Sequence, residues 1–255
     1  MNSVAAAYSA GAAAWAAGPA RVYGRLADAL VAFSPSPLAG LAVLDLGSGT
    51  GVGSVAAHAA GARVIATDIS WDMLRVDRAT RPPAFTADAL DLPLRSSGLD
   101  VVLAAFSLNH FEDPGAAMRE ARRIAPLVLA STYASDDDHP AKSAVDTALT
   151  EHGWSAPDWY TRFKGAMQSW GTVETASATI GRAGLHAVKV ERHEVPFPDF
   201  TASDLVAWRL GMAHTAPYVA ALDRSDRDAV TSRALELLGP NPEPLVRKVI
   251  FVAAN

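Results

Sequence analysis

The chain contains the segment Val43-Leu44-Asp45-Leu46-Gly47-Ser48-Gly49-Thr50-Gly51-Val52-Gly53, in which a short apolar run leads into closely spaced glycines. The apolar run is typical of a buried parallel strand, and helical spacing follows the glycines. A side chain at Gly47 or Gly49 would keep a ligand from lying against the backbone. A glycine-rich turn between a strand and a helix suits a dinucleotide, a phosphate or another adenosine compound.

Strand-like and helical segments alternate around this turn. We expect strands at 41–46, 63–67, 84–86, 99–105, 127–132, 187–195 and 246–253. We expect helices near 51–60, 71–79, 114–124 and 224–238, and two consecutive helices between residues 2 and 33 that break at Gly18-Pro19. Such alternation predicts an α/β fold with a doubly wound, mostly parallel sheet and helices on both of its faces.

The segments outside this alternation suggest additional covers on the sheet. We expect an N-terminal helical lid over residues 1–37, followed by one domain over residues 38–255. Two inserts, at about 133–171 and 196–222, fall at the loop edge of the sheet and hold Trp154, Trp159, Trp170 and Trp208. Ligands of open α/β sheets bind beyond the carboxyl ends of the strands, so these inserts would enclose a substrate pocket. Alternatively, the tryptophans only pack small helices onto the body.

Two carboxylates follow neighbouring strands of the predicted sheet. Asp68 ends the second strand, where a carboxylate binds the two hydroxyls of a ribose. Asp88 follows the third strand, where a carboxylate could accept an adenine amino group. The ligand is therefore an adenosine compound. Each residue of the pattern also has a purely structural explanation, since Asp45 could close a strand and Asp68 could cap the following helix.

The sequence resembles the class I S-adenosyl-L-methionine (SAM) dependent methyltransferases. The resemblance rests on four ordered blocks, closely over residues 41–132: Leu44–Gly51, Ala66–Ser70, Ala87–Pro93 and Phe106–Phe111. Within the class, the chain looks most like the small-molecule enzymes of the ubiquinone and menaquinone type and their natural-product relatives. The resemblance implies a seven-stranded Rossmann-like sheet whose last strand is antiparallel and lies between the fifth and sixth.

The resemblance also implies SAM as the cofactor, S-adenosyl-L-homocysteine as its product, and a set of cofactor contacts. The residues that it assigns to the cofactor are Tyr8, Asp45, Gly47, Ser48, Gly49, Gly51, Asp68, Ile69, Asp88, Ala89 and Phe106. The glycines would surround the methionine part of the cofactor. Asp68 would bind the ribose, and Ile69 would pack against the face of the adenine. Tyr8 would belong to a lid over SAM, unless its Ala-rich segment is a packing helix or a homodimer contact.

The segment after the fourth strand indicates which kind of atom accepts the methyl group. It reads Ser107-Leu108-Asn109-His110, whereas methyltransferases of base amines and protein amides carry an Asn/Asp/Ser-Pro-Pro-aromatic tetrad there. We therefore expect transfer to an oxygen or carbon, less so to nitrogen, of a small, mostly apolar organic acceptor. A histidine ordinarily titrates near neutrality, so we expect His110 to be the first candidate base, unless it only packs or forms a hydrogen bond. His214 and Glu112 are the second and third candidates.

The sequence gives less support to other functions. A protein of this fold that binds SAM could be repurposed as a cyclase or another catalyst that does not methylate. Tyr160 and Lys164 match the Tyr-x-x-x-Lys pair of nicotinamide-dependent short-chain dehydrogenases, but the glycine turn differs from theirs. The run 136–140, Asp-Asp-Asp-His-Pro, could bind Mg²⁺ or Ca²⁺, yet a helix start capped by Asp138 or His139 explains it better, and we expect no metal.

Composition limits the partners. The chain has 255 residues, a formal net charge of −5 and no cysteine, which excludes disulfides and thiol chemistry. It has no block of five or six basic residues, which argues against nucleic acid as a partner. It lacks both a basic signal-peptide start and an 18-residue apolar run. We therefore expect a cytoplasmic protein without a membrane span.

Overall fold

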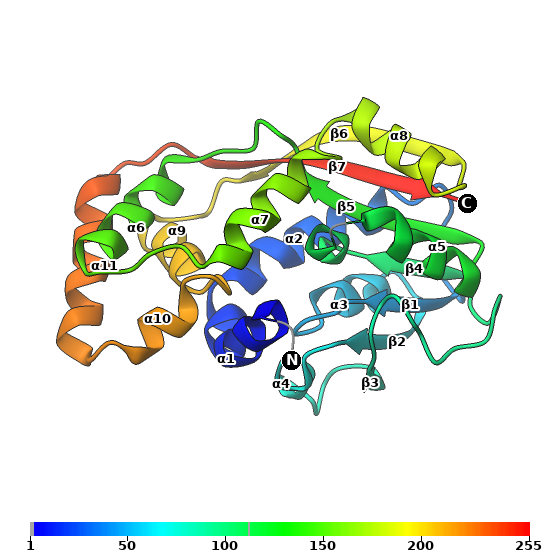
Figure 1. Ribbon diagram of the computed structural model, residues 1–255, viewed down its shortest axis with the longest axis horizontal. Coiled ribbons are helices and arrows are strands. Elements are labelled where there is room, and N and C mark those ends of the chain that lie inside the picture. Colours follow the sequence, from blue (N-terminus) through cyan, green and yellow to red (C-terminus); the bar gives the residue numbers. More distant parts are fainter. Residues whose placement is uncertain (1–2, 112) are drawn as a thin grey trace.

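A seven-stranded sheet forms the centre of the computed structural model, which describes residues 3–111 and 113–255 (Figure 1). The strands are β1 (Ala42–Leu46), β2 (Arg63–Asp68), β3 (Ala84–Thr86), β4 (Val101–Ala104), β5 (Leu127–Tyr133), β6 (Ala187–Phe197) and β7 (Leu245–Ala254). Their order is β3-β2-β1-β4-β5-β7-β6. The strands from β3 to β5 are parallel, and β7 runs antiparallel between β5 and β6. The predicted α/β fold with its inserted antiparallel strand is confirmed.

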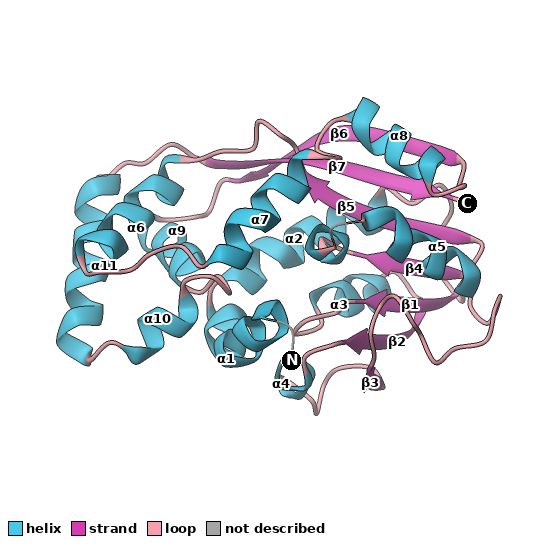
Figure 2. Cartoon of the chain, in the orientation of Figure 1, coloured by secondary structure: helices cyan, strands magenta, loops and turns pink. Residues whose placement is uncertain are grey.

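Helices cover both faces of the sheet and gather beyond its carboxyl edge (Figure 2). They are α1 (Ser3–Ala17), α2 (Pro19–Ala32), α3 (Val52–Ala59), α4 (Trp71–Arg75), α5 (Pro114–Ile124), α6 (Pro140–Glu151), α7 (Asp158–Gln168), α8 (Val173–Arg182), α9 (Ala202–Leu210), α10 (Ala216–Ala221) and α11 (Arg224–Leu238). A 3₁₀ turn, η1 (Ser107–His110), follows β4.

Alternating side chains on the strands divide the core between the two faces, as the two-residue period of a strand requires. Val43 of β1 packs in the cluster that includes Val22 and Leu26 of α2. Leu44, the next residue, packs in the cluster that includes Met118 of α5 and Ile180 of α8. Both faces of the sheet are thus buried, which explains why the parallel strands are short apolar runs.

The helix predicted at residues 71–79 is shorter than expected. It ends at Arg75, because Val76 has an extended backbone with ψ 132° and Asp77 adopts a left-handed conformation with φ 51°. Its N-cap is Ser70, whose hydroxyl accepts a hydrogen bond from the backbone N–H of Met73 at 3.2 Å. Asp68, which the sequence offers as an alternative cap, instead accepts a hydrogen bond from the backbone of the glycine turn. The helix start predicted at 136–140 is confirmed, with His139 as its cap.

The two inserts form a helical layer beyond the carboxyl ends of the parallel strands (Figure 1). Helices α6, α9 and α11 share a cluster of their own, which includes Val145, Trp154 and Val230. Trp154 and Trp170 are buried in hydrophobic clusters, as expected if these tryptophans pack helices onto the body of the protein. Trp159 and Trp208 line a cavity, and Trp208 also belongs to the main hydrophobic cluster; that these inserts enclose a substrate pocket stays a prediction.

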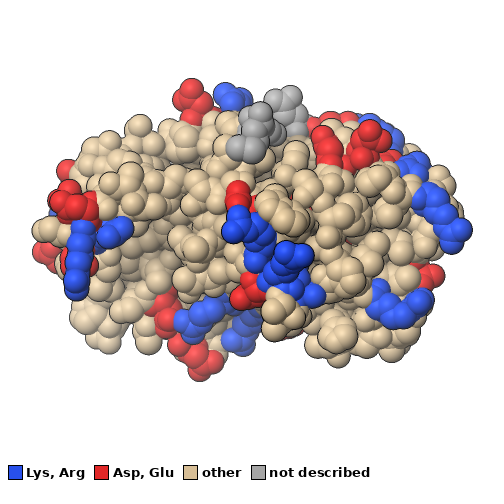
Figure 3. Space-filling view, turned by 90° about the horizontal axis from the view of Figure 1, so that it is seen from below, with Lys and Arg blue, Asp and Glu red and all other residues tan. Residues whose placement is uncertain are grey.

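The outer surface mixes charges of both signs. On the face seen from below, Lys and Arg are interspersed with Asp and Glu, and broad uncharged areas separate the groups (Figure 3). Within residues 3–111 and 113–255, no helix is both long and apolar enough to cross a lipid bilayer.

The N-terminal helices join the insert layer through closely packed glycines. Gly211 ends α9, and a Cβ atom there would lie 2.6 Å from the carbonyl oxygen of Ala14 and 2.6 Å from Cδ of Pro19. The backbone of α9 therefore approaches the junction of α1 and α2 closely. Gly24, in the middle of α2, has no neighbour within 4 Å of the same position.

We predict that Gly211→Ala lowers the free energy of unfolding by about 1–3 kcal/mol, because the added methyl overpacks the contact between α9 and the N-terminal helices. Gly24→Ala is the matched control and should be neutral or raise the stability by up to about 1 kcal/mol, since alanine favours a helix interior. Urea denaturation of both variants measures these differences. Equal stability of the two variants would contradict the close approach.

Candidate functional site

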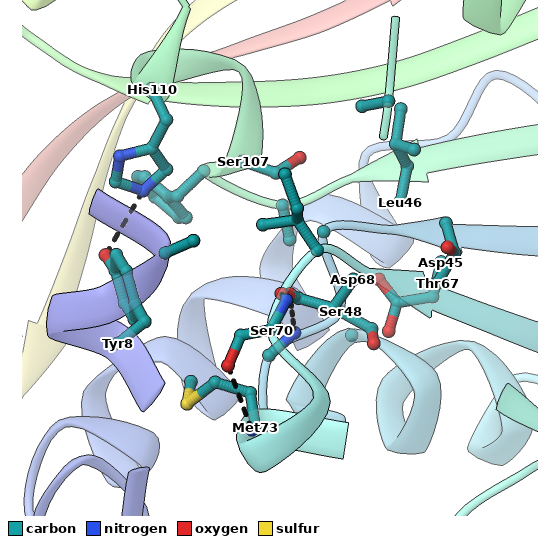
Figure 4. Close-up of a pocket in the computed structure, with 18 of the residues that line it drawn as sticks. Tyr8, Asp45, Leu46, Ser48, Thr67, Asp68, Ser70, Met73, Ser107 and His110 are labelled. Atoms are coloured by element: carbon teal, nitrogen blue, oxygen red, sulfur yellow. Dashed lines mark hydrogen bonds between the residues drawn. The ribbon is translucent and has the colours of Figure 1, made fainter. Parts of the chain in front are cut away.

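A cavity of about 250 Å³ opens at the carboxyl ends of β1, β2 and β4 (Figure 4). Its walls include ten of the eleven residues that the resemblance assigns to the cofactor: Tyr8, Asp45, Gly47, Ser48, Gly49, Asp68, Ile69, Asp88, Ala89 and Phe106. His110 also lines it. Gly51 is outside the lining and occupies the N-cap position of α3. The structure thus brings the sequence blocks at the ends of four strands, β1 to β4, to one edge.

The glycine turn depends on backbone that other residues rarely adopt. Gly47, Gly49 and Gly51 have φ values of 66°, 53° and 98°. A Cβ atom on Gly47 would overlap the side chain of Ser107, so this glycine lets β1 and the segment after β4 come together. A Cβ atom on Gly49 would lie 3.2 Å from Cε of Met73 and narrow the cavity. The turn therefore leaves backbone open to a ligand at Gly49.

The carboxylate of Asp68 ties two loops of the site together. Oδ2 accepts the backbone N–H of Gly49 at 2.8 Å, and Oδ1 accepts that of Ser70 at 2.8 Å. Each oxygen has a further lone pair, so the carboxylate can still accept hydrogen bonds from a ligand. Burial raises the pKa of Asp68, while the backbone hydrogen bonds and Arg81 oppose the shift.

Asp45 is buried beneath the glycine turn. Its Oδ2 accepts the hydroxyl of Ser54 at 2.6 Å, and a Cβ atom on Gly53 would lie only 2.8 Å from Oδ1. Burial raises the pKa of Asp45 to about 6, although the Ser54 hydrogen bond and Arg81 favour the ionised form. Gly53 and Ser54 are thus part of the support of the turn, in addition to the assigned residues.

Arg81 is a component of the site that the sequence did not reveal. Its Nη1 donates to the carbonyl oxygens of Gly49 at 3.2 Å and Met73 at 3.3 Å, and its Nη2 donates to Oγ of Ser48 at 2.9 Å. The guanidinium therefore holds the glycine turn against α4. No motif surrounds Arg81, and it lies beyond the helix that it fastens, so only the folded chain identifies it.

Apolar side chains flank the other end of the cavity. Ile69 is 49% exposed and Leu90 is 47% exposed, so both offer aliphatic surface beside the cavity. Asp88 Oδ1 accepts the backbone N–H of Leu90 at 2.9 Å. Burying such aliphatic surface against a flat ring would stabilise a complex.

Tyr8 and His110 point toward one another at one side of the cavity (Figure 4). The hydroxyl of Tyr8 and Nε2 of His110 are 3.1 Å apart and hydrogen-bonded. Burial raises the pKa of Tyr8 well above its usual value and lowers the pKa of His110 to about 4. Both side chains are therefore neutral at physiological pH. Nearby, Phe106 holds a left-handed conformation with φ 60°, a costly backbone state for a residue with a side chain.

A second cavity of about 410 Å³ adjoins the first and lies under the helices of the inserts. The two cavities share four lining residues: Tyr8, Tyr23, Phe106 and His110. His214 lines only the second cavity, where its ring stacks on Tyr160 with centroids 3.7 Å apart. Glu112, the third candidate base, lies outside the described residues.

Comparison with known proteins agrees with this geometry. Residues 44–126 match the family model described as a methyltransferase domain. The demethylmenaquinone methyltransferase of Clavibacter sepedonicus is 30% identical over 169 residues, which cover 60% of this chain and 69% of that protein. The enzyme of the same name from Corynebacterium kroppenstedtii is 28% identical over 163 residues, covering 60% of this chain and 71% of that protein.

Solved structures share the fold at low sequence identity. A protein of Anabaena variabilis, assigned as a methyltransferase of an antibiotic biosynthesis pathway, has a TM-score of 0.57 and 16% identity, covering 89% of this chain and 96% of its own. The cyclase SpnF has a TM-score of 0.52 and 18% identity, covering 91% of this chain and 80% of its own.

The strand order, the glycine turn after β1 and the carboxylate after β2 define a SAM-dependent methyltransferase. The chain belongs to the class I SAM-dependent methyltransferases of the quinone and small-molecule type. Its cofactor is SAM, and the first cavity fits that molecule. The fit rests on three observations: the open backbone at Gly49, the spare lone pairs of Asp68, and the buried hydroxyl of Ser107, which has no hydrogen-bond partner among the described residues.

The raised pKa of Asp45 predicts a pH-dependent stability. A carboxyl whose pKa is about 6 when folded and 3.8 when unfolded stabilises the fold fully below pH 3.8 and loses that contribution as the pH rises through 6. We predict that Asp45→Asn, which keeps a carbonyl for Ser54, gains up to about 3 kcal/mol of unfolding free energy relative to wild type between pH 4 and 7.5.

Urea denaturation of the ligand-free protein at several pH values measures this difference. Ser54→Ala should steepen the loss of stability in the same range, because ionised Asp45 loses a hydrogen bond. Parallel pH profiles of wild type and Asp45→Asn would contradict the assignment.

Proposed function

We propose that this enzyme transfers the methyl group to an oxygen or carbon, rather than a nitrogen, of a small and mostly apolar organic acceptor. The observation that carries the proposal is the pair of adjoining cavities with a common wall at Tyr8, Tyr23, Phe106 and His110. A cofactor in the first cavity and an acceptor in the second would meet at that wall. The volume of the second cavity suits a small molecule rather than a polymer.

We assign the cofactor contacts by the chemistry of each group in the first cavity. The carboxylate of Asp68 would accept the ribose hydroxyls, and the aliphatic surface of Ile69 would cover the adenine, with Asp88 and Ala89 at the edge of the ring. The open backbone at Gly49 and the hydroxyl of Ser107 would receive the methionine end. When bound, SAM supplies a methyl group on a sulfonium, which is already a strong electrophile. The protein then has to align the acceptor and exclude water.

Three features favour oxygen or carbon as the acceptor atom. The segment Ser107–His110 lacks the proline-rich tetrad of enzymes that methylate base amines and protein amides. Aromatic side chains, among them Tyr133 and Trp208, line the second cavity. The similar proteins of Clavibacter sepedonicus and Corynebacterium kroppenstedtii are demethylmenaquinone methyltransferases.

His110 suits an orienting role better than that of a strong base. Its burial keeps the imidazole neutral and makes the imidazolium costly, and an efficient base has a pKa near the working pH. A neutral imidazole that exchanges a hydrogen bond with Tyr8 can do the same with an acceptor hydroxyl. His214 is less suited to orienting the acceptor, because its Nε2 already accepts a hydrogen bond from Arg209.

Helix α1 suits a lid over both cavities. Tyr8 reaches His110 at 3.1 Å, and Oγ of Ser9 is 2.8 Å from Oγ of Ser70, beside the Asp68 loop. These two hydrogen bonds link the helix to the acceptor side and the cofactor side respectively. Movement of α1 would admit the substrates, and its return would exclude water from the reacting groups.

The reaction can be tested with a panel of hydroxyarenes and arylamines. Incubation with SAM and catechol, 1-naphthol, 1,4-naphthalenediol or 1-naphthylamine, followed by mass spectrometry, identifies the methylated atom. Methylation at oxygen or carbon with release of S-adenosyl-L-homocysteine supports the proposal. Methylation confined to the amine would overturn it, and so would a rearranged acceptor with SAM unchanged, as a cyclase would give.

We predict that Asp68→Ala weakens SAM binding by about 10- to 100-fold, because the ribose loses charge-assisted hydrogen bonds. Asp72→Ala is the matched control: this carboxylate, on α4, pairs with Arg75 at the surface and does not line the cavity. Calorimetry with SAM measures both affinities, and thermal melting checks that both variants fold. Wild-type affinity in Asp68→Ala would remove the carboxylate from the cofactor site.

We predict that His110→Ala lowers kcat by about 10- to 100-fold through misplacement of the acceptor, with SAM affinity unchanged within a few-fold, whereas His110→Gln keeps most of the rate. Because burial lowers the pKa of His110 to about 4, protonation of this residue should not depress kcat until the pH falls toward 4. His58→Gln, an exposed change on α3, is the control. An acidic limb near pH 6.5 that vanishes in His110→Gln would establish a base instead.

A further inference from the structure

Two arginines are almost completely buried in the wall of the second cavity. Arg209 comes from α9 and Arg247 from β7, and their side chains are only 4% and 3% exposed. Removing a guanidinium from water is costly unless acceptors surround it. The two arginines differ in how far that requirement is met.

Arg247 is fully engaged by a carboxylate. Its Nε donates to Oδ1 of Asp137 at 3.0 Å and its Nη2 to Oδ2 at 2.6 Å, a bidentate pair. Burial alone would raise the pKa of Asp137, but Arg247 and Lys142 outweigh it and hold the pKa at about 2. This pair fastens β7 to the loop after β5 and occupies the Nε–Nη2 edge of the guanidinium, the edge that would otherwise bind a carboxylate of a ligand through two parallel hydrogen bonds.

Arg209 is only partly engaged. Its Nη2 makes a single 3.3 Å contact with Oδ1 of Asp146, and the other contact of that nitrogen is the ring Nε2 of His214 at 3.3 Å. Its Nε is buried and has no hydrogen-bond partner among the described residues. A guanidinium offers five N–H donors in a fixed fork, so Arg209 keeps donors that the protein itself does not use.

The surroundings of Arg209 favour a flat anion. The ring of Trp208 lines the cavity, and its indole N–H is buried without a partner among the described residues. Tyr160 stacks on His214, and Nζ of Lys164 lies 4.8 Å from the Tyr160 ring centroid. Burial, with help from Arg209 and Lys164, lowers the pKa of His214 well below its usual value, so its ring is neutral beside the guanidinium.

We infer that the methyl acceptor carries a carboxylate on an aromatic framework, and that this carboxylate binds the unused donors of Arg209. The inference rests on the proposed function, because it takes the second cavity as the acceptor site. Arg209 and His110 line the same cavity, so one molecule can place its anionic end at the first and its reacting end near the second. The carboxylate would distinguish this acceptor from an uncharged quinone.

The test is equilibrium binding of matched acids and amides to the full-length protein saturated with S-adenosyl-L-homocysteine. The probes are benzoate and benzamide, 2-naphthoate and 2-naphthamide, and biphenyl-4-carboxylate and its carboxamide. In each pair the shape is nearly the same, but the amide is uncharged and has an NH2 donor in place of one acceptor oxygen. We expect the acid to bind at least about tenfold more tightly than the amide in one or more pairs, since hydrogen bonds to a charged group are stronger.

Variants locate the preference. Arg209→Gln should abolish it, and Asp146→Asn should strengthen acid binding, because it removes the one carboxylate that competes for the guanidinium. Arg233→Gln is the matched control: this arginine pairs with Glu151 and Glu236 on α6 and α11, outside the cavity, and the preference should be unchanged. Should Arg209→Gln not fold, Asp146→Asn still decides, since Asp146 is 33% exposed and tolerates a polar replacement.

Equal affinity for acid and amide in every pair, or no binding in any, overturns the inference. A preference that persists in Arg209→Gln, or acid binding that Asp146→Asn fails to strengthen, also overturns it. Failure of the inference can be distinguished from failure of the proposed function, because the proposed function is tested by the atom that receives the methyl group. Methylated hydroxyarenes without any acid preference leave the proposed function in place, whereas acid binding through Arg209 without methylation at oxygen or carbon removes only the proposed reaction.

Discussion

The carboxylate of Asp68 holds the site together, because it accepts one backbone N–H from the glycine turn and another from the start of α4. Through these two bonds, the loops that follow β1 and β2 become one rigid edge. Arg81 fastens the same loops from the other side, through carbonyl oxygens and the hydroxyl of Ser48. A negative and a positive group thus share the same turn. Each offsets part of the cost of burying the other.

Helix α1 and the insert helices lie beyond the sheet, next to that edge. Helix α1 rests on it through Ser9 and Ser70, and the insert helices enclose a second cavity beside it. The two cavities share a wall that is formed by Tyr8, Tyr23, Phe106 and His110. These residues come from α1, α2 and the segment after β4. A reaction at this wall would proceed away from bulk water, which strengthens the electrostatic interactions available there.

The fold was largely predictable, because its signals are local. Buried parallel strands are short apolar runs, and the glycine turn needs positive φ at Gly47, Gly49 and Gly51. The end of α4 is not encoded by a local signal, since the turn at Asp77 contains neither proline nor glycine. The strand order beyond β5 followed from the family resemblance rather than from the residues, because antiparallel insertion leaves no local mark.

The sequence by itself determined the α/β fold and indicated an adenosine compound as ligand, because each of these signals lies within a short motif. The cofactor SAM and most residues of the first cavity followed from the resemblance of four such motifs to a known family. Only the tertiary structure decided what surrounds the acceptor. Arg81, Arg209 and the contact between Tyr8 and His110 become meaningful through partners from distant parts of the chain. Burial decided the rest: the low pKa of His110 arises from desolvation, which no local pattern of residues encodes.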